Sequence, residues 1–145
     1  MNNKLLVEVK KFFEDYYDQD LIDEEINKNY SLIENNYNNE DEIDKDIHIV
    51  TMLKNKILIS IINRVKNEDL DSELYLIEKY GFIHDLYSRR HGIEGNNILY
   101  EGAMSDAINN YDGFGSFTVF LYNSICKKYK SKSKESIKKE LTIKK

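Results

Sequence analysis

Apolar residues recur at steps of three and four along most of this chain, and no proline interrupts them. Leu5, Val9, Phe12 and Tyr16 open the pattern with steps of four, three and four. Since an α-helix turns once in about 3.6 residues, this spacing places the apolar side chains on one helical face. We therefore predict amphipathic helices packed around a shared core, the first of them over residues 3–17.

A second helix is predicted from Leu21 to Tyr37, with the same spacing of apolar side chains. Asp18 or Asp20 stands where an N-cap is expected, because a short carboxylate accepts hydrogen bonds from the free N–H groups of a first helical turn. A run of asparagines from Asn35 discourages continuation, so the helix should end there.

The third helix is expected to lie at the centre of the fold. Residues 38–46 form a polar, acidic loop, and Asp46 is predicted to cap a helix that continues to Val65. Its apolar face is expected to carry Ile47, Val50, Leu53 or Lys54, Ile57, Ile61 and Val65. The β-branched run from Ile57 to Ile62 also fits a strand. Because the periodic stretch of about twenty residues is longer than an ordinary strand of about 4–8, we favour the helix.

Three shorter helices follow, and glycines mark the expected ends of the first two. Gly81 is predicted to close the helix around residues 71–80, and Gly92 the next one. The third covers residues 100–111, although Gly102 in its interior costs about 1 kcal/mol against alanine. A glycine retained at that cost suggests close packing.

The last helix is predicted to begin after a clear break at residues 112–115, Asp-Gly-Phe-Gly. Ser116 is placed to cap it, and its apolar residues continue to Tyr129. Residues 117–122 are rich in aromatic and β-branched side chains, so a short strand is the alternative there.

These patterns predict an all-α protein, a single-domain bundle of about six to seven helices. The chain has 145 residues, a length that suits one domain. We expect the helical domain to occupy residues 1–130. Residues 131–145 are rich in lysine and serine and are expected to form a basic, mobile tail, with a frayed helix as the alternative.

Charge is distributed unevenly. Residues 1–50 carry 14 acidic and 5 basic side chains, whereas residues 114–145 carry 2 and 9. An acidic surface repels nucleic acids and membranes and attracts basic proteins at rates that fall with salt. We therefore expect a basic protein as the partner, and neither direct contact with nucleic acid nor a membrane. The oligomeric state does not follow from the sequence.

A single cysteine, Cys126, allows no internal disulfide and fits a reducing compartment. The first apolar cluster, residues 5–7, is broken by Glu8, so no signal peptide or membrane span is predicted. The expected location is the cytoplasm. No metal-binding spacing of cysteine or histidine occurs, and we expect no metal and no cofactor.

One cluster suggests catalysis: His84, Arg89, Arg90 and His91. Two imidazoles and an arginine supply a base, an acid and a phosphate clamp, which metal-independent RNA cleavage requires. On one helix, His84 and His91 share a face two turns apart. The simpler interpretation is a solvated helix end, where basic side chains are stabilised by the helix dipole.

The acidic first third combines carboxylates with tyrosines, a residue type enriched at interface hot spots. We predict that the partner binds Glu14, Tyr17, Asp18, Asp20, Asp23, Glu24, Glu25, Glu40, Asp41 and Glu42. In fold class and charge, though not in sequence, such a chain resembles the immunity proteins that neutralise bacterial toxins.

That resemblance implies a binding protein without catalysis, an immunity or antitoxin-type inhibitor that blocks a basic nuclease toxin by occlusion. The alternatives are a small helical ribonuclease using His84, Arg89 and His91, and a structural or phage-encoded adaptor with the basic tail as its tether.

Overall fold

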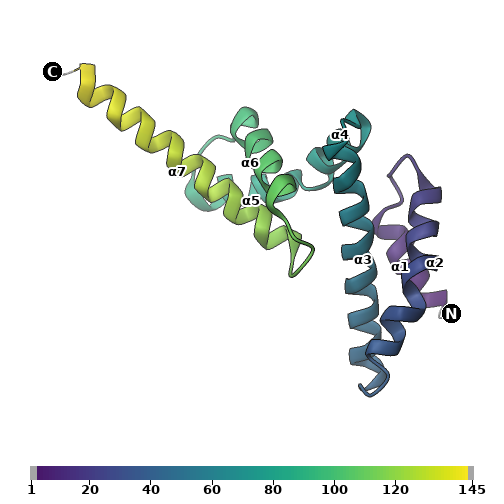
Figure 1. The fold of residues 1–145 in the computed structure, drawn as a ribbon. Helices are drawn as coiled ribbons and strands as arrows, with labels where there is room; N and C mark the ends of the chain where they lie inside the picture. The colour runs from purple at the N-terminus through teal and green to yellow at the C-terminus, as the bar shows by residue number, and fades with distance from the viewer. Residues whose placement is uncertain (1–2, 144–145) are drawn as a thin grey trace. The chain divides into compact units, whose positions relative to one another are not determined.

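The computed structural model describes the backbone of residues 3–143 and the side chains of residues 3–132. Over these residues the chain forms seven helices and no strand, which confirms the predicted all-α fold class. The strand alternatives for residues 57–62 and 117–122 are wrong, because both segments are helical. The helices are α1 (Asn3–Phe12), α2 (Gln19–Asn36), α3 (Glu42–Lys66), α4 (Leu70–Lys79), α5 (Gly81–His91), α6 (Asn97–Asn110) and α7 (Phe117–Ile143) (Figure 1).

The chain divides into two compact units, Met1–Tyr75 (unit 1) and Leu76–Lys145 (unit 2), and the boundary falls inside α4. Unit 1 carries 18 acidic and 9 basic side chains, and unit 2 carries 8 and 12. The acidic head and the basic tail therefore belong to different units. The assignment of residues 1–130 to one domain stays a prediction.

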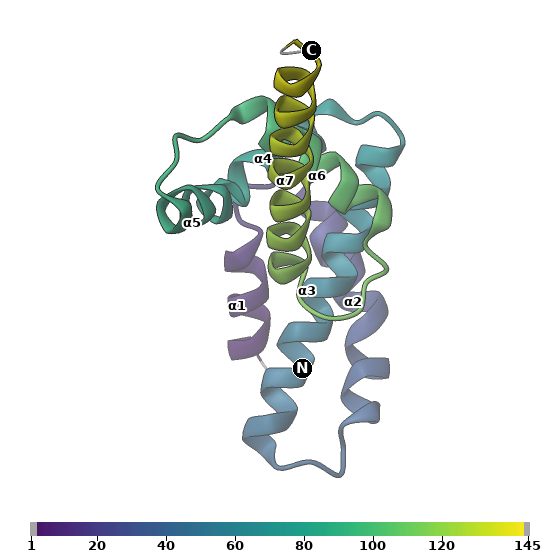
Figure 2. The same ribbon diagram turned by 90° about the vertical axis from the view of Figure 1, so that its left-hand side faces the viewer.

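Unit 1 is built on α3, against which α1 and α2 both pack (Figures 1 and 2). Its fully buried side chains come from all three helices and the turn after α1: Val9, Phe13, Ile22, Ile49, Leu53, Ile57 and Ile61. Burying one such side chain contributes about 1.5–3 kcal/mol. Because α1 has only 10 residues, this packing rather than helix propensity holds it in place.

α1 ends at Phe12, well before the predicted end at residue 17. The side-chain amide of Gln19 donates to the carbonyls of Phe13 and Tyr16 at 3.0 and 2.8 Å. These bonds hold the turn that follows α1, in which the N–H of Tyr16 also donates to the carbonyl of Phe13 at 3.0 Å. Phe13 and Tyr16 are buried outside the helix, so their spacing extended the predicted helix past its end.

The N-cap predicted at Asp18 or Asp20 is confirmed at Asp18. The carboxylate of Asp18 accepts from the N–H of Leu21 at 3.3 Å and caps α2. The cap predicted at Asp46 is wrong, because α3 begins at Glu42 and Asp41 holds the N-cap position. Acidic residues in the first turn of α3 are stabilised by the helix dipole, which favours this earlier start.

Unit 2 consists mainly of α5, α6 and α7, with α7 packed on both of the others. Its core side chains are Tyr80, Ile83, Met104, Ile108, Leu121 and Ile125. A Cβ at Gly102 would lie 3.1 Å from Cε of Lys128, whose ammonium pairs with Asp106 at 2.9 Å. The close packing predicted at Gly102 is therefore present.

Of the two glycines predicted to end helices, Gly92 does so and Gly81 does not. Gly92 ends α5 with φ +58, a left-handed conformation that favours glycine, so this prediction is confirmed. Gly81 does not close α4 but is the first residue of α5. Tyr80 makes the link with a negative φ of −101, so no left-handed residue is needed between these two helices.

The break before α7 is confirmed at residues 112–115, where Gly113 and Gly115 have φ of 89 and 73. The hydroxyl of Ser116 accepts from the N–H of Val119 at 3.4 Å, as predicted for a cap. The backbone of α7 continues to Ile143. Most side chains of the predicted tail, residues 131–145, lie outside the described residues, and its mobility stays a prediction.

Candidate protein-binding surface

Two residues predicted to bind a partner, Tyr17 and Asp18, take part in a polar network inside unit 1. The guanidinium of Arg64 lies 2.7 Å from Oδ2 of Asp18 and donates to the hydroxyls of Tyr16 and Tyr17, both at 3.3 Å. The Tyr17 hydroxyl donates to Asp69. That hydrogen bond holds the pKa of the Asp69 carboxyl below its ordinary value.

The inner part of this network is buried. The hydroxyls of Tyr16 and Ser72 lie 2.7 Å apart, and Ser72 donates to Asp69 at 2.7 Å. The hydrogen bond from Arg64 holds the pKa of the Asp18 carboxyl below its ordinary value. The network joins the turn after α1 to the connection between α3 and α4, so these residues have a structural role besides any role in binding.

The other predicted residues near the start of α2 are mostly exposed. Asp23 pairs with Lys10 at 3.1 Å, and Glu25 accepts from the side-chain amide of Asn29 at 3.0 Å. Three carboxylates are exposed and form no ion pair with any described residue: Glu14, Asp20 and Glu24. Their charge is available to a partner.

A second group of predicted residues lies between α2 and α3. Glu40 pairs with Nδ1 of His48 at 2.5 Å, and the His48 ring lies against Tyr37 with 4.7 Å between ring centroids. Asp41 and Glu42 are exposed and form no ion pair within the described part of the chain. These two carboxylates are as accessible as those at the start of α2.

Helix α2 separates the two groups. It has 18 residues, and at about 1.5 Å per residue it is about 27 Å long. Residues 14–25 lie around its start, and residues 40–42 follow its end (Figure 2). The ten predicted residues therefore form two surfaces rather than one.

The second surface adjoins a groove between α1 and α3 that apolar spacing did not predict. The groove has a volume of about 200 Å³ and is lined by Leu5, Glu8, Asp46, Ile47, Val50, Thr51 and Lys54. Ile47, predicted to face the core, is 57% exposed, and Ile43 one turn earlier is 70% exposed. The sequence feature that indicates this apolar surface is the four-residue step between the two isoleucines, which continues the apolar face of α3 beyond its buried part.

In unit 2, the two histidines of the predicted catalytic cluster occupy different environments. His84 is buried, with its ring stacked on Tyr100 at 4.8 Å and its Nε2 2.6 Å from the hydroxyl of Tyr129. His91 is exposed and lies against Tyr87, with 4.3 Å between ring centroids. Tyr87 also contacts Tyr129 at 4.8 Å, so aromatic rings connect the two imidazoles.

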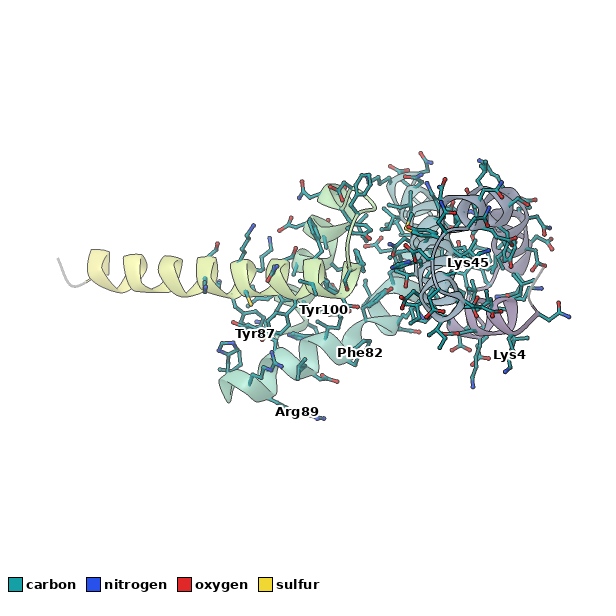
Figure 3. The ribbon with its side chains drawn as sticks, turned by 90° about the horizontal axis from the view of Figure 1, so that it is seen from below. Lys4, Lys45, Phe82, Tyr87, Arg89 and Tyr100 are labelled. Atoms are coloured by element: carbon teal, nitrogen blue, oxygen red, sulfur yellow. The ribbon has the colours of Figure 1, made fainter. Side chains whose placement is uncertain are left out.

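The arginines of that cluster are both exposed. Arg89 extends away from α5 (Figure 3). The guanidinium of Arg90 lies over the ring of Tyr122, 5.6 Å from its centroid. In the ribonuclease alternative, the imidazoles of His84 and His91 would act as acid and base, so both would have to reach one phosphate. His84 is only 4% exposed, which keeps it from such a substrate. The geometry does not favour the ribonuclease alternative.

The environment of His84 predicts how stability depends on pH. Burial lowers the pKa of His84 from its ordinary value of 6.5, so the unfolded chain takes up a proton that the folded chain resists. The free energy of unfolding should therefore fall as pH decreases below about 6.5, by at most about 1.4 kcal/mol per pH unit. Urea unfolding at about pH 7.5 and about pH 5 measures this loss.

The matched variants for that experiment are His84→Gln and His91→Gln. His84→Gln should lose less stability between the two pH values than the unchanged protein, while His91→Gln should behave like the unchanged protein. The pKa values of Asp18 and Asp69 are lowered from their ordinary value of 3.8. The stability that these two carboxylates contribute is therefore lost mainly below about pH 3.8, outside this pH range. An equal loss in the protein and in His84→Gln would show that another group causes it.

Within the described residues, no group of three or more His, Cys, Asp or Glu side chains is arranged to hold a metal ion. Among the same residues, no helix has the length and apolar character needed to cross a membrane. No family model, no curated protein and no solved structure matches the chain.

Proposed function

We propose that this chain is a binding protein that inhibits a basic protein by covering its functional surface, without catalysis of its own. One observation carries the proposal: unit 1 carries twice as many acidic as basic side chains, and several of its carboxylates are exposed without ion pairs among the described residues. An uncompensated surface of one sign attracts a partner of the opposite sign.

The partner class follows from this charge. A nuclease binds phosphates through lysine and arginine, so its active groove is basic. An acidic helical surface placed over that groove competes with the nucleic acid and blocks turnover. The proposed biological role is that of a cytoplasmic immunity or antitoxin-type protein that neutralises a bacterial nuclease toxin.

The test starts with capture of a partner from the native host at low salt, followed by measurements on the purified partner. The partner should be basic, and its activity should fall to zero at a stoichiometric ratio. The quadruple variant Asp20→Asn, Glu24→Gln, Asp41→Asn, Glu42→Gln should bind about tenfold more slowly, with a weaker dependence on salt.

The matched control replaces exposed neutral residues of the same unit by serine, at Asn27, Asn35, Asn36 and Asn39. This variant should bind at the unchanged rate. A partner whose association rate is the same in both variants and insensitive to salt would contradict electrostatic recognition by unit 1. A complex that leaves the partner's activity intact would contradict inhibition.

A further inference from the structure

The groove between α1 and α3 combines an apolar floor with an acidic border. Leu5 and Val50 are each 6% exposed and form the floor, and Ile47 stands at the side with more than half of its surface exposed. An apolar pocket with a polar rim is the arrangement found at the energetic centre of protein interfaces.

Charge divides the groove into two ends. At one end, the ammonium of Lys54 lies 3.9 Å from Glu8 and 4.5 Å from the ring centre of Phe12, so its charge is already engaged. At the other end, Asp46 forms no ion pair with a described residue, and the exposed Asp44 lies two residues before it. The free charge beside the groove is therefore negative.

Lys45, the basic residue between Asp44 and Asp46 in the sequence, does not neutralise this end. Lys45 donates to the side-chain oxygen of Asn38 at 3.1 Å and forms no ion pair within the described residues. Glu40 pairs with His48, but Asp41 and Glu42 form no ion pair with any residue that the structure describes. The carboxylates of residues 41–46 thus outnumber the positive charges available to them.

The size of the groove limits what it holds. A volume of about 200 Å³ is below the roughly 300–1,000 Å³ of sites for small molecules. It suits one or two side chains of a partner protein. Ile43 and Ile47, four residues apart on α3 and both exposed, add an apolar strip on one helical face next to the groove, which the apolar face of a partner helix can contact.

From these observations we infer that the groove between α1 and α3 binds an amphipathic, basic helix of the partner protein. An apolar side chain of that helix enters beside Ile47, and its lysines or arginines face the carboxylates of residues 41–46. This inference rests on the proposed function and specifies which of the two acidic surfaces makes the central contact.

The probe is a fluorescein-labelled amphipathic helical peptide of lysine and leucine, compared with a lysine and serine peptide of equal charge. Fluorescence anisotropy should show tighter binding of the leucine peptide. Ile47→Ser should weaken that binding about tenfold, because it removes the apolar contact at the centre of the interface. Asp46→Asn should weaken the binding of both peptides.

Two matched controls separate this groove from the rest of unit 1. Leu32→Ser removes an exposed apolar side chain of α2, and Asp15→Asn removes an exposed carboxylate in the turn between α1 and α2. Both should bind the leucine peptide as the unchanged protein does. Amide chemical shifts in NMR spectra should change along α1 and the first half of α3.

The possible results distinguish binding in the groove from electrostatic binding elsewhere on unit 1. Equal effects of Ile47→Ser and Leu32→Ser, or shift changes centred on the start of α2, would overturn the groove and leave electrostatic binding in place. Failure of both peptides to bind at low salt would overturn the proposed function as well. A dimer in sedimentation that Ile47→Ser dissociates would show that a second copy is the occupant.

Discussion

Truncation of Ile57 to alanine is expected to remove about 2–5 kcal/mol from the free energy of unfolding. Ile57 is fully buried at the centre of α3, where both α1 and α2 pack, and alanine would leave a cavity there. Ile59→Ala is the matched control, since the same residue type two positions later is only half-buried. It should lose clearly less. Urea unfolding followed by circular dichroism measures both values.

This pair also tests the local structure. In a strand, Ile57, Ile59 and Ile61 would face the same side and respond alike, because side chains alternate with a period of two. In the helix, Ile57 and Ile61 are buried and Ile59 is turned away from them. Equal losses for Ile57→Ala and Ile59→Ala would contradict the helical packing of α3.

The second large effect is expected from Tyr129→Phe. The Tyr129 hydroxyl accepts from the N–H of Asn96 at 2.9 Å and lies 2.6 Å from Nε2 of the buried His84. Without the hydroxyl, Nε2 of His84 loses its hydrogen bond, and leaving a buried polar atom without a partner costs about 1–3 kcal/mol. Tyr122→Phe is the control, because the Tyr122 hydroxyl accepts a long hydrogen bond of 3.5 Å from the exposed Arg90. Its loss should lower the free energy of unfolding by less than about 0.5 kcal/mol.

Unfolding by urea gives the two free energies, and hydrogen exchange at the Asn96 amide gives an independent readout. Exchange should be faster in Tyr129→Phe and unchanged in Tyr122→Phe. If the two variants lost equal stability, the hydrogen bonds of Tyr129 would contribute nothing beyond packing of its ring.

The helices themselves were largely predictable, because each one buries an apolar face whose spacing is visible in the sequence. The interior of α3 shows this best, since Leu53, Ile57 and Ile61 are all buried as expected. The ends were less predictable. α1 stops early at Phe12, and Gln19 holds the turn that follows it through the carbonyls of Phe13 and Tyr16. α3 starts early at Glu42 although a good capping residue follows at Asp46.

The candidate surface was predicted only in part. Its charge can be counted along a short stretch of sequence, whereas its geometry depends on contacts between residues far apart in the chain. The excess of carboxylates in residues 1–50 is plain in the sequence. The contacts of Tyr17 and Asp18 with Arg64 are not visible in the sequence, since Arg64 lies more than forty residues away along the chain. The groove likewise depends on Leu5 and Ile47 meeting across two helices.

The opposite charges of the two units also have a consequence for handling the protein in solution. Near the isoelectric point of about 5.3 the net charge vanishes, yet an excess of carboxylates in one half and of lysines in the other persists. When little salt is present, the acidic unit of one molecule attracts the basic unit of another, and net repulsion no longer keeps the molecules apart. Added salt screens that attraction, so solubility at this pH should rise with ionic strength.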